Sequence, residues 1–166
     1  PLLNEMIWLS YDLLAEKDKQ AAHDFLVRAM QTSEREHETV WLGTVQPHKR
    51  LAHQGLSRYY DINVLDMLAS CESGWDHSTR CDDRWLEHLP VDLNAMLYRR
   101  ERDYERFAML QGDTARAESW AARAAKRRET LLDLMWDEGQ GFFFDYDITN
   151  QACNLLPSLA GFYPLW

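Results

Sequence analysis

PVDLNAMLYRRERDYERFAMLQGDTARAESWAARAAKRRETLLDLM, residues 90–135, decides the fold class of this chain. Apolar residues recur in it at the three- and four-residue spacing of an amphipathic helix. In the first half of the stretch these residues are Leu93, Met96, Leu97, Tyr104, Phe107 and Ala108. In the second half they are Trp120, Ala121, Ala124, Leu131, Leu132 and Met135. Pro90 suits a first helical turn, and Gly112-Asp113 ends one helix and caps the next. The stretch therefore predicts two consecutive helices.

Residues 2–41 show the same helical spacing on both sides of a polar run at residues 16–20. The apolar positions before and after this run are Leu2, Leu3, Met6, Ile7, Leu9, Leu13 and Leu14, then Ala22, Phe25, Leu26, Ala29, Met30, Val40 and Trp41. Because the polar break is short, we expect an antiparallel helical hairpin here.

Two long stretches, residues 43–60 and 72–89, have no helical pattern and are expected to be loops. Loops of this length are uncommon in a compact domain unless they are functional. Between them, a short helix is expected after Asp61, and its apolar face would hold Val64, Leu65, Leu68 and Cys71.

One segment reads as a strand. From Phe142 to Ile148, aromatic and other residues alternate with a period of two, after Gly139 and Gly141 break the preceding helix. A last helix is expected near Ser158. The pattern as a whole predicts an all-α chain of about three helical hairpins with a small β-hairpin.

The composition limits the classes of partner that the chain is expected to have. The chain has 166 residues, of which 46% are hydrophobic and 12% aromatic, which is typical of a globular domain. The net charge of −9 argues against nucleic acid as a partner, since phosphates require clustered Lys and Arg. No apolar run approaches the roughly 18 residues that span a membrane, so no membrane partner is expected. The histidines show no metal-ligand spacing, so we expect no metal and no cofactor.

The three cysteines, Cys71, Cys81 and Cys153, form no C-x-x-C pair. Free, buried thiols are the simplest interpretation, and they fit a reducing compartment. The compartment itself stays open, with the cytoplasm slightly favoured. Both ends of the chain, Pro1-Leu2-Leu3 and the apolar run from Phe162 to Trp166, look internal to a longer protein, because natural ends are usually solvated.

The loop at residues 72–85, ESGWDHSTRCDDRW, has the most unusual composition in the chain. It holds four carboxylates, two arginines, two tryptophans and a histidine. Gly74 allows close approach to a ligand or a sharp turn, and Trp75 offers an apolar wall beside the carboxyl group of Asp76. Such a wall disfavours the ionised form of a carboxyl group, which suits a general acid. On composition alone, a solvated, salt-bridged loop is the competing interpretation.

Glu72-Ser73-Gly74-Trp75-Asp76, followed by Ser78 and Arg80, resembles the trehalase family signature E-S-G-W-D-x-S-x-R. Further stretches resemble other family motifs, and they occur in the family's order. They are Pro1-Leu2-Leu3 (Q-P-P-L-L), Leu56-Ser57-Arg58-Tyr59-Tyr60 (L-N-R-Y-Y), Pro90-Val91-Asp92-Leu93-Asn94-Ala95 (P-V-D-L-N-A), residues 136–147 (W-D-E…G…F-D-Y-D) and Pro164-Leu165-Trp166 (P-L-W).

The resemblance implies that residues 1–166 are part of an (α/α)6 toroid, the catalytic domain of a six-hairpin glycosidase. It implies hydrolysis of trehalose or a related α-glucoside with inversion, with Asp76 as general acid and a small carbohydrate as the partner. Gly74, Trp75 and Arg80 are the expected substrate-binding residues, although a structural salt bridge is as good a role for Arg80. The general base of the family lies before a motif that is absent here, so the remainder of the catalytic domain would supply it.

The chain departs from the family in one place. Members carry P-R-P-E-S between R-Y-Y and S-G-W-D, and its Arg and Glu bind sugar, whereas residues 61–71 hold no such motif. A trehalase-like branch, or the neighbouring α-glucosidase family with the same toroid, is therefore an open alternative. A non-catalytic toroid that binds carbohydrate or acts as a scaffold is the competing functional class.

For Asp92 and Asn94, a role at the positive end of a helix is expected rather than sugar contact. Tyr59, Tyr60 and Trp85 are expected in the core.

Overall fold

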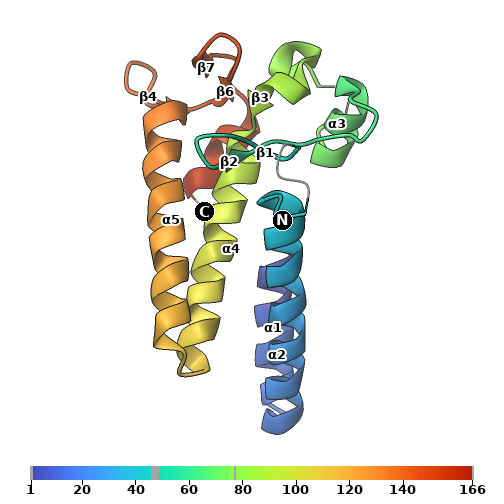
Figure 1. Cartoon of the computed structure of the whole chain (residues 1–166), viewed down its shortest axis with the longest axis vertical. Helices are drawn as coiled ribbons and strands as arrows, with labels where there is room; N and C mark the ends of the chain where they lie inside the picture. The colour runs from blue at the N-terminus through green and yellow to red at the C-terminus, as the bar shows by residue number, and fades with distance from the viewer. Residues whose placement is uncertain (1, 46–48, 77, 166) are drawn as a thin grey trace.

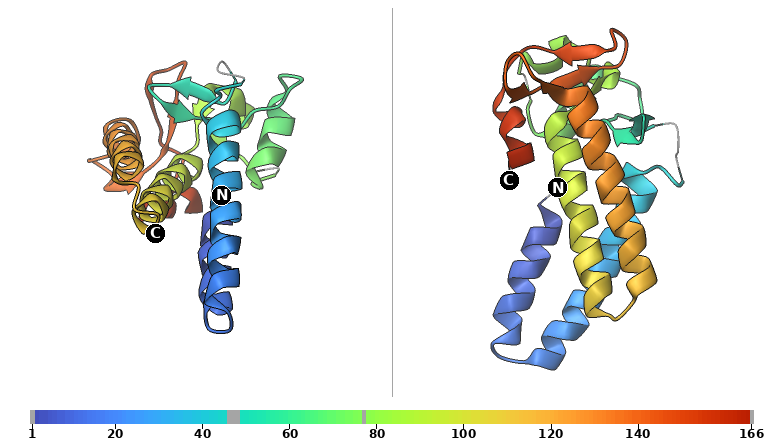
Figure 2. Two further views of the ribbon diagram at one scale, coloured as in Figure 1. Left: turned by 60° about the horizontal axis from the view of Figure 1, so that its bottom comes forward. Right: turned by 90° about the vertical axis from the view of Figure 1, so that its left-hand side faces the viewer.

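The computed structural model describes residues 2–45, 49–76 and 78–165. The parts of the predictions that involve Pro1, His77 and Trp166 lie outside these described residues. Within them, the predicted helical character is confirmed, and the longest elements form two antiparallel pairs (Figures 1 and 2).

The first pair joins helix α1 (Leu3–Ala15) to α2 (Lys19–Glu36), which continues into the π-helical turn η1 (His37–Trp41). The second joins α4 (Val91–Leu110) to α5 (Thr114–Met135). In each pair, a side chain from the short polar break caps the beginning of the second helix, α2 or α5. Asp18 accepts hydrogen bonds from the backbone N–H groups of Gln20 and Ala21. Asp113 accepts one from Arg116, directly after Gly112 at φ 73°.

The pairs pack together through a buried apolar cluster. Its members come from all four long helices and are Ile7, Trp8, Leu26, Met30, Tyr104, Phe107 and Trp120. The opposite side of α1 is open, with Met6, Leu9 and Leu13 about 60% exposed (64%, 62% and 57%). None of the described helices combines the length and the apolar character that crossing a bilayer requires.

Short elements gather at one end of the helices, where α4 begins and α5 ends (Figure 1). A short helix, α3 (Asp66–Ser73), is followed by the 3₁₀ turns η2 (Arg80–Asp83) and η3 (Trp85–Glu87). Strands β1 (Leu51–His53) and β2 (Leu56–Ser57) form one antiparallel pair. Strands β4 (Trp136–Asp137) and β5 (Phe142–Phe143) form another. Strand β6 (Asp145–Asp147) lies between β3 (His88–Leu89) and β7 (Ala152–Asn154), with Tyr146 opposite both Leu89 and Cys153. A final 3₁₀ segment, η4, spans Leu159–Leu165.

Two details of the helical prediction differ. Of the about three helical hairpins expected, the described residues hold two complete ones, because the segment after Asp61 provides only the single short helix α3. The predicted apolar face of that helix is wrong. The helix begins at Asp66 rather than directly after Asp61, so Ala69 and Ser70 are buried while Cys71 is exposed.

The segment predicted as extended from Phe142 to Ile148 forms strands up to Asp147, but it belongs to two sheets instead of one hairpin, and Ile148 begins a turn. The change of sheet occurs at Phe144, whose backbone N–H donates to the carbonyl of Met135 at the end of α5 (2.8 Å). The predicted loop at residues 43–60 likewise contains the β1–β2 pair. The three cysteines are free, as expected, but only Cys81 is buried.

Candidate active site

A buried arginine joins three parts of the chain at the strand-bearing end. The Nε and Nη2 atoms of Arg80, in η2, donate to the two carboxylate oxygens of Asp145, in β6 (2.7 and 2.6 Å). Nη2 also donates to Oδ1 of Asp92, in the first turn of α4 (2.5 Å). All three side chains are at most 4% exposed. Two carboxylates and one guanidinium therefore share a nearly dry site, where charged hydrogen bonds are strong and removing a partner is expensive.

The surroundings keep this arginine charged. Burial lowers the pKa of the Arg80 guanidinium, but the hydrogen bonds and charges of Asp145 and Asp92 outweigh it, so the pKa lies above its ordinary value. Asp145 also accepts a hydrogen bond from the backbone N–H of Val91 (2.9 Å), which ties β6 to the beginning of α4.

Asp92 collects donors from the candidate loop as well. Its Oδ2 atom accepts from the indole N–H of Trp75 (2.9 Å) and from the hydroxyl of Tyr59 (3.3 Å). Burial and the charge of Asp92 together raise the pKa of Tyr59 well above its ordinary value, so the phenol stays a donor. Asp92 thus binds side chains rather than the open end of its helix, which differs from the capping role expected.

Asn94 is likewise a structural residue. Its side chain exchanges hydrogen bonds with the backbone N–H and C=O of Ser57 in β2 (2.9 and 2.8 Å). The core positions expected for Tyr59 and Trp85 are confirmed, since these side chains are 2% and 1% exposed.

The loop that carries Asp76 is fixed on both sides of Trp75. Gly74 ends α3 in the left-handed conformation at φ 75°, and a Cβ there would meet nothing within 4 Å. The backbone N–H of Trp75 donates to Oγ of Ser73 (2.9 Å), and its carbonyl accepts from the backbone N–H of Ser78 (3.2 Å). The conformational role of Gly74 as a turn residue is therefore plain, and the open space at its Cα leaves room for a ligand.

Asp76 itself is exposed, next to a half-buried Trp75. Across the part of the chain that the structure describes, no hydrogen bond or ion pair engages its carboxylate. Through the Trp75–Asp92 hydrogen bond, this loop lies at the beginning of α4, at the same end as Tyr59. A carboxyl group without a protein partner, beside an aromatic ring, can in its protonated form donate a proton to a bound molecule.

Of the predicted site residues, Gly74, Trp75 and Asp76 are consecutive at this surface, whereas Arg80 lies beneath it. The Arg80 guanidinium carbon is 5.2 Å from the centroid of the Trp75 ring and 5.4 Å from that of Trp85. Its Nε and Nη2 donors serve Asp92 and Asp145, as the salt-bridge interpretation expected, whereas Nη1 is buried without a hydrogen-bond partner among the described residues. Sequence reasoning missed Asp145, and the available signal was an acidic residue within an aromatic, alternating strand pattern.

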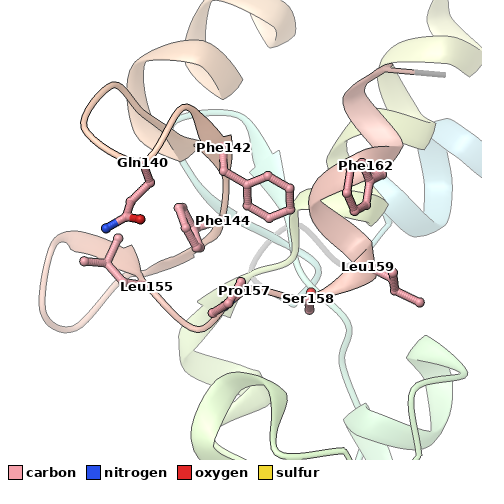
Figure 3. Close-up of a pocket in the computed structure, with 8 residues that line it drawn as sticks. All are labelled: Gln140, Phe142, Phe144, Leu155, Pro157, Ser158, Leu159 and Phe162. Atoms are coloured by element: carbon pink, nitrogen blue, oxygen red, sulfur yellow. The ribbon is translucent and has the colours of Figure 1, made fainter.

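A separate cavity of about 700 Å³ lies beside β5 and η4 (Figure 3). The Phe142 ring lies 5.3 Å from the rings of both Phe144 and Phe162, measured between centroids. The other lining residues are Gln140, Leu155, Pro157, Ser158 and Leu159. The lining is mostly apolar and includes none of the four predicted site residues. Among the residues that the structure describes, no group of acidic, His and Cys side chains is arranged to hold a metal ion.

A protein-family model described as Trehalase matches residues 66–166, which include the whole candidate loop, α4, α5 and the strands beyond them. The chain belongs to the trehalase family. The resemblance seen in the motifs is thereby confirmed.

Curated members of the trehalase family agree. The periplasmic trehalase of Salmonella agona is 32% identical over 109 residues, which cover 61% of this chain and 19% of that protein. The putative periplasmic trehalase of Salmonella typhi matches to the same extent. The matched part of this chain therefore spans about a fifth of the length of these trehalases. Both are periplasmic by name, so the slight preference for the cytoplasm is not confirmed.

A solved trehalase extends the likeness to the complete chain. Neutral trehalase Nth1 from Saccharomyces cerevisiae superposes with a TM-score of 0.78 and 24% sequence identity, covering 100% of this chain and 40% of the yeast chain. At this identity the likeness concerns the fold. It confirms the predicted class, an all-α chain that forms part of an (α/α)6 toroid.

Proposed function

We propose that the protein containing this chain hydrolyses trehalose or a related α-glucoside with inversion, and that Asp76 is its general acid. The observation that carries the proposal is the family match across the loop in which a free, exposed Asp76 follows the anchored Trp75. Nothing in the comparisons favours the alternative of a non-catalytic binding or scaffold protein.

In the proposed reaction, the protonated carboxyl group of Asp76 donates its proton to the glycosidic oxygen as the bond to the anomeric carbon breaks. A base on the opposite face of the sugar removes a proton from the attacking water, and the two groups of an inverting pair stand roughly 6.5–9.5 Å apart to admit that water. Trp75 and Gly74 provide the wall and the open space beside the acid. Arg80 supports them from below, because it is buried and its Nε and Nη2 donors are engaged by Asp92 and Asp145.

We also propose that residues 1–166 belong to one catalytic domain and that the remainder of this domain supplies the base. The open apolar side of α1 and the mostly apolar cavity of Figure 3 support this proposal. Contiguous apolar surfaces of this kind usually bind a protein partner, and among the described residues that line the cavity only Gln140 and Ser158 have polar side chains. Such a lining suits packing against further helices better than contact with sugar hydroxyls.

The proposal also names a substrate and a compartment. Trehalose is the sugar named in the family and its relatives, and related α-glucosides are included because residues 61–71 lack the sugar-binding motif noted above. The preference for the cytoplasm rests on the free cysteines alone and stays a prediction.

The stereochemistry of the product tests the reaction. The full-length protein is incubated with trehalose and with a panel of α-glucosides, and the anomeric protons of the first glucose released are followed by NMR before mutarotation. Inversion predicts β-glucose from the attacked residue, and for trehalose an equal amount of α-glucose from the leaving residue. Residues 1–166 alone are expected to release none, since the base lies outside them. Release of α-glucose only, or no release by the full-length protein from any substrate, contradicts the proposal.

A further inference from the structure

We propose that Asp92 is a positioning residue for the general acid, which it holds in place through the indole of Trp75. The inference rests on the proposed function and deepens it, since it assigns a role to a residue that does not touch the sugar. The juxtaposition behind it is a buried carboxylate in the first turn of α4 that binds the side chain directly preceding Asp76.

The two oxygens of Asp92 have different partners. Oδ1 accepts from Arg80, and Oδ2 accepts from Trp75 and Tyr59. Arg80 does not need Asp92 to be held, because Asp145 already binds its Nε and Nη2 atoms with two short hydrogen bonds. The hydrogen bond from the indole N–H to Oδ2 therefore does more than complete an ion pair. It joins the loop of Asp76 to the rigid end of a 20-residue helix.

Trp75 is held at three points. Its backbone N–H is bound by Ser73, its carbonyl by Ser78 and its indole N–H by Asp92. The first two bonds join Trp75 to residues within three positions along the chain, at the end of α3 and in the loop, whereas the third reaches α4, 17 residues away. A reacting group has to be held to within about half an ångström, and a misplacement of about 1 Å can lower a rate on the order of 100-fold. The indole bond is the one that sets the position of Asp76 relative to the toroid.

The chain offers a matched control for this bond. Trp75 and Trp85 both contact the Arg80 guanidinium at nearly the same distance. The indole nitrogen of Trp85, however, is buried without a hydrogen-bond partner among the described residues. Trp75→Phe therefore removes the bond to Asp92, whereas Trp85→Phe removes an indole of the same size and no hydrogen bond.

The first experiment measures kcat and KM of full-length Trp75→Phe and Trp85→Phe on the best α-glucoside, with a melting curve for each variant. We expect kcat of Trp75→Phe to fall roughly 10- to 100-fold, with KM changed less than about threefold and the melting temperature nearly unchanged. The kcat of Trp85→Phe should stay within about twofold, whatever its effect on the melting temperature. Equal kcat values for the two variants overturn the inference, and so does a loss that appears only in KM, which would make Trp75 a substrate-binding wall.

The second experiment asks whether Trp75 acts through Asp92. The test is a double-mutant cycle. Trp75→Phe should lower the kcat of the Asp92→Ala variant by less than about threefold, whereas the same substitution should lower the kcat of the unmodified protein at least about tenfold. Asp92→Asn, which keeps an oxygen acceptor for the indole, should retain more activity than Asp92→Ala. Additive losses of kcat overturn the inference. If Asp92→Ala does not fold, the comparison of Trp75→Phe with Trp85→Phe decides the inference. An unmodified protein that releases no sugar overturns the proposed function instead, so the two failures are distinguishable.

Discussion

At the scale of single residues, charge burial determines which side chains are structural and which are available. Arg80 looked equally suited to a sugar and to a salt bridge from its loop composition, because sequence spacing does not reveal that Asp145 lies across from it. That pairing is long-range, joining η2 to β6 through the fold. Asp76 differs in that its neighbours along the chain, Gly74 and Trp75, already predict an exposed turn with an aromatic wall. The exposed turn was therefore predictable from the local sequence and the network beneath it was not, while the role of Asp76 as acid comes from the motif resemblance and stays a prediction.

A second buried network, in the helices, titrates in a useful range. Burial lowers the pKa of His37 from 6.5 to about 4, although the hydrogen bond between its Nε2 and the Glu101 carboxylate favours the charged ring. Glu101 in turn accepts from Arg127 in α5 (2.9 Å). His37 is therefore neutral in the folded state at pH 7, and protonating it at lower pH favours unfolding. Its stabilising contribution is fully present above pH 6.5 and is lost as the pH falls through about 4.

We predict that the titration of His37 alone lowers the free energy of unfolding by about 3 kcal/mol when the pH falls from 7 to 4. The measurement is urea unfolding of the full-length protein at several pH values, with His37→Gln as the non-titrating control. Carboxylates contribute to acid unfolding in both proteins, so the difference between the two curves isolates His37. A pH dependence that is the same with and without the imidazole would contradict this assignment.

At the scale of elements, the long helices were predictable and the short strands were not. The α4 and α5 helices carry continuous apolar stripes with Gly112 and Asp113 between them, and a stripe over many turns is a redundant signal. Segment 142–148 alternates over too few residues to show that Phe144 leaves one sheet for another. That change depends on the backbone hydrogen bond to Met135, which is a tertiary contact. Helix α3 was misplaced for a similar reason, because its first turn carries no side-chain cap.

Two turn glycines test the link between an element boundary and the site. Gly74 and Gly112 have nearly the same positive φ, 75° and 73°, and open space around the missing Cβ. Replacing either by Ala should lower the free energy of unfolding by about 1–2 kcal/mol, because only the backbone strain changes. We predict that Gly74→Ala also lowers kcat, since it displaces Trp75 and Asp76, whereas Gly112→Ala leaves kcat unchanged. Urea unfolding and initial rates on the full-length protein measure both effects. Equal kcat values would show that the α3 boundary does not set the position of the acid.

At the scale of the whole molecule, the chain forms two packed helical hairpins with the candidate site at one end. The motif order predicted the toroid, and the superposition on neutral trehalase Nth1 confirms that class over the full chain. Periodicity alone could predict helices but not how many hairpins close a ring, because ring closure depends on chain beyond the 40% of the yeast protein that is matched. The exposed apolar side of α1 supports the proposal that further parts of the domain pack there.

The central claim, that Asp76 is the general acid, is tested most directly by changing the leaving group. Rates of the full-length protein and of Asp76→Asn are compared on trehalose, whose leaving oxygen needs a proton, and on α-glucosyl fluoride, whose fluoride needs far less help. Loss of a general acid typically lowers a rate on the order of 10²–10⁴-fold. We predict a loss of that size on trehalose and a loss below about tenfold on the fluoride, with the variant still folded by its melting curve. Equal losses on both substrates, or full activity on trehalose, would contradict the role assigned to Asp76.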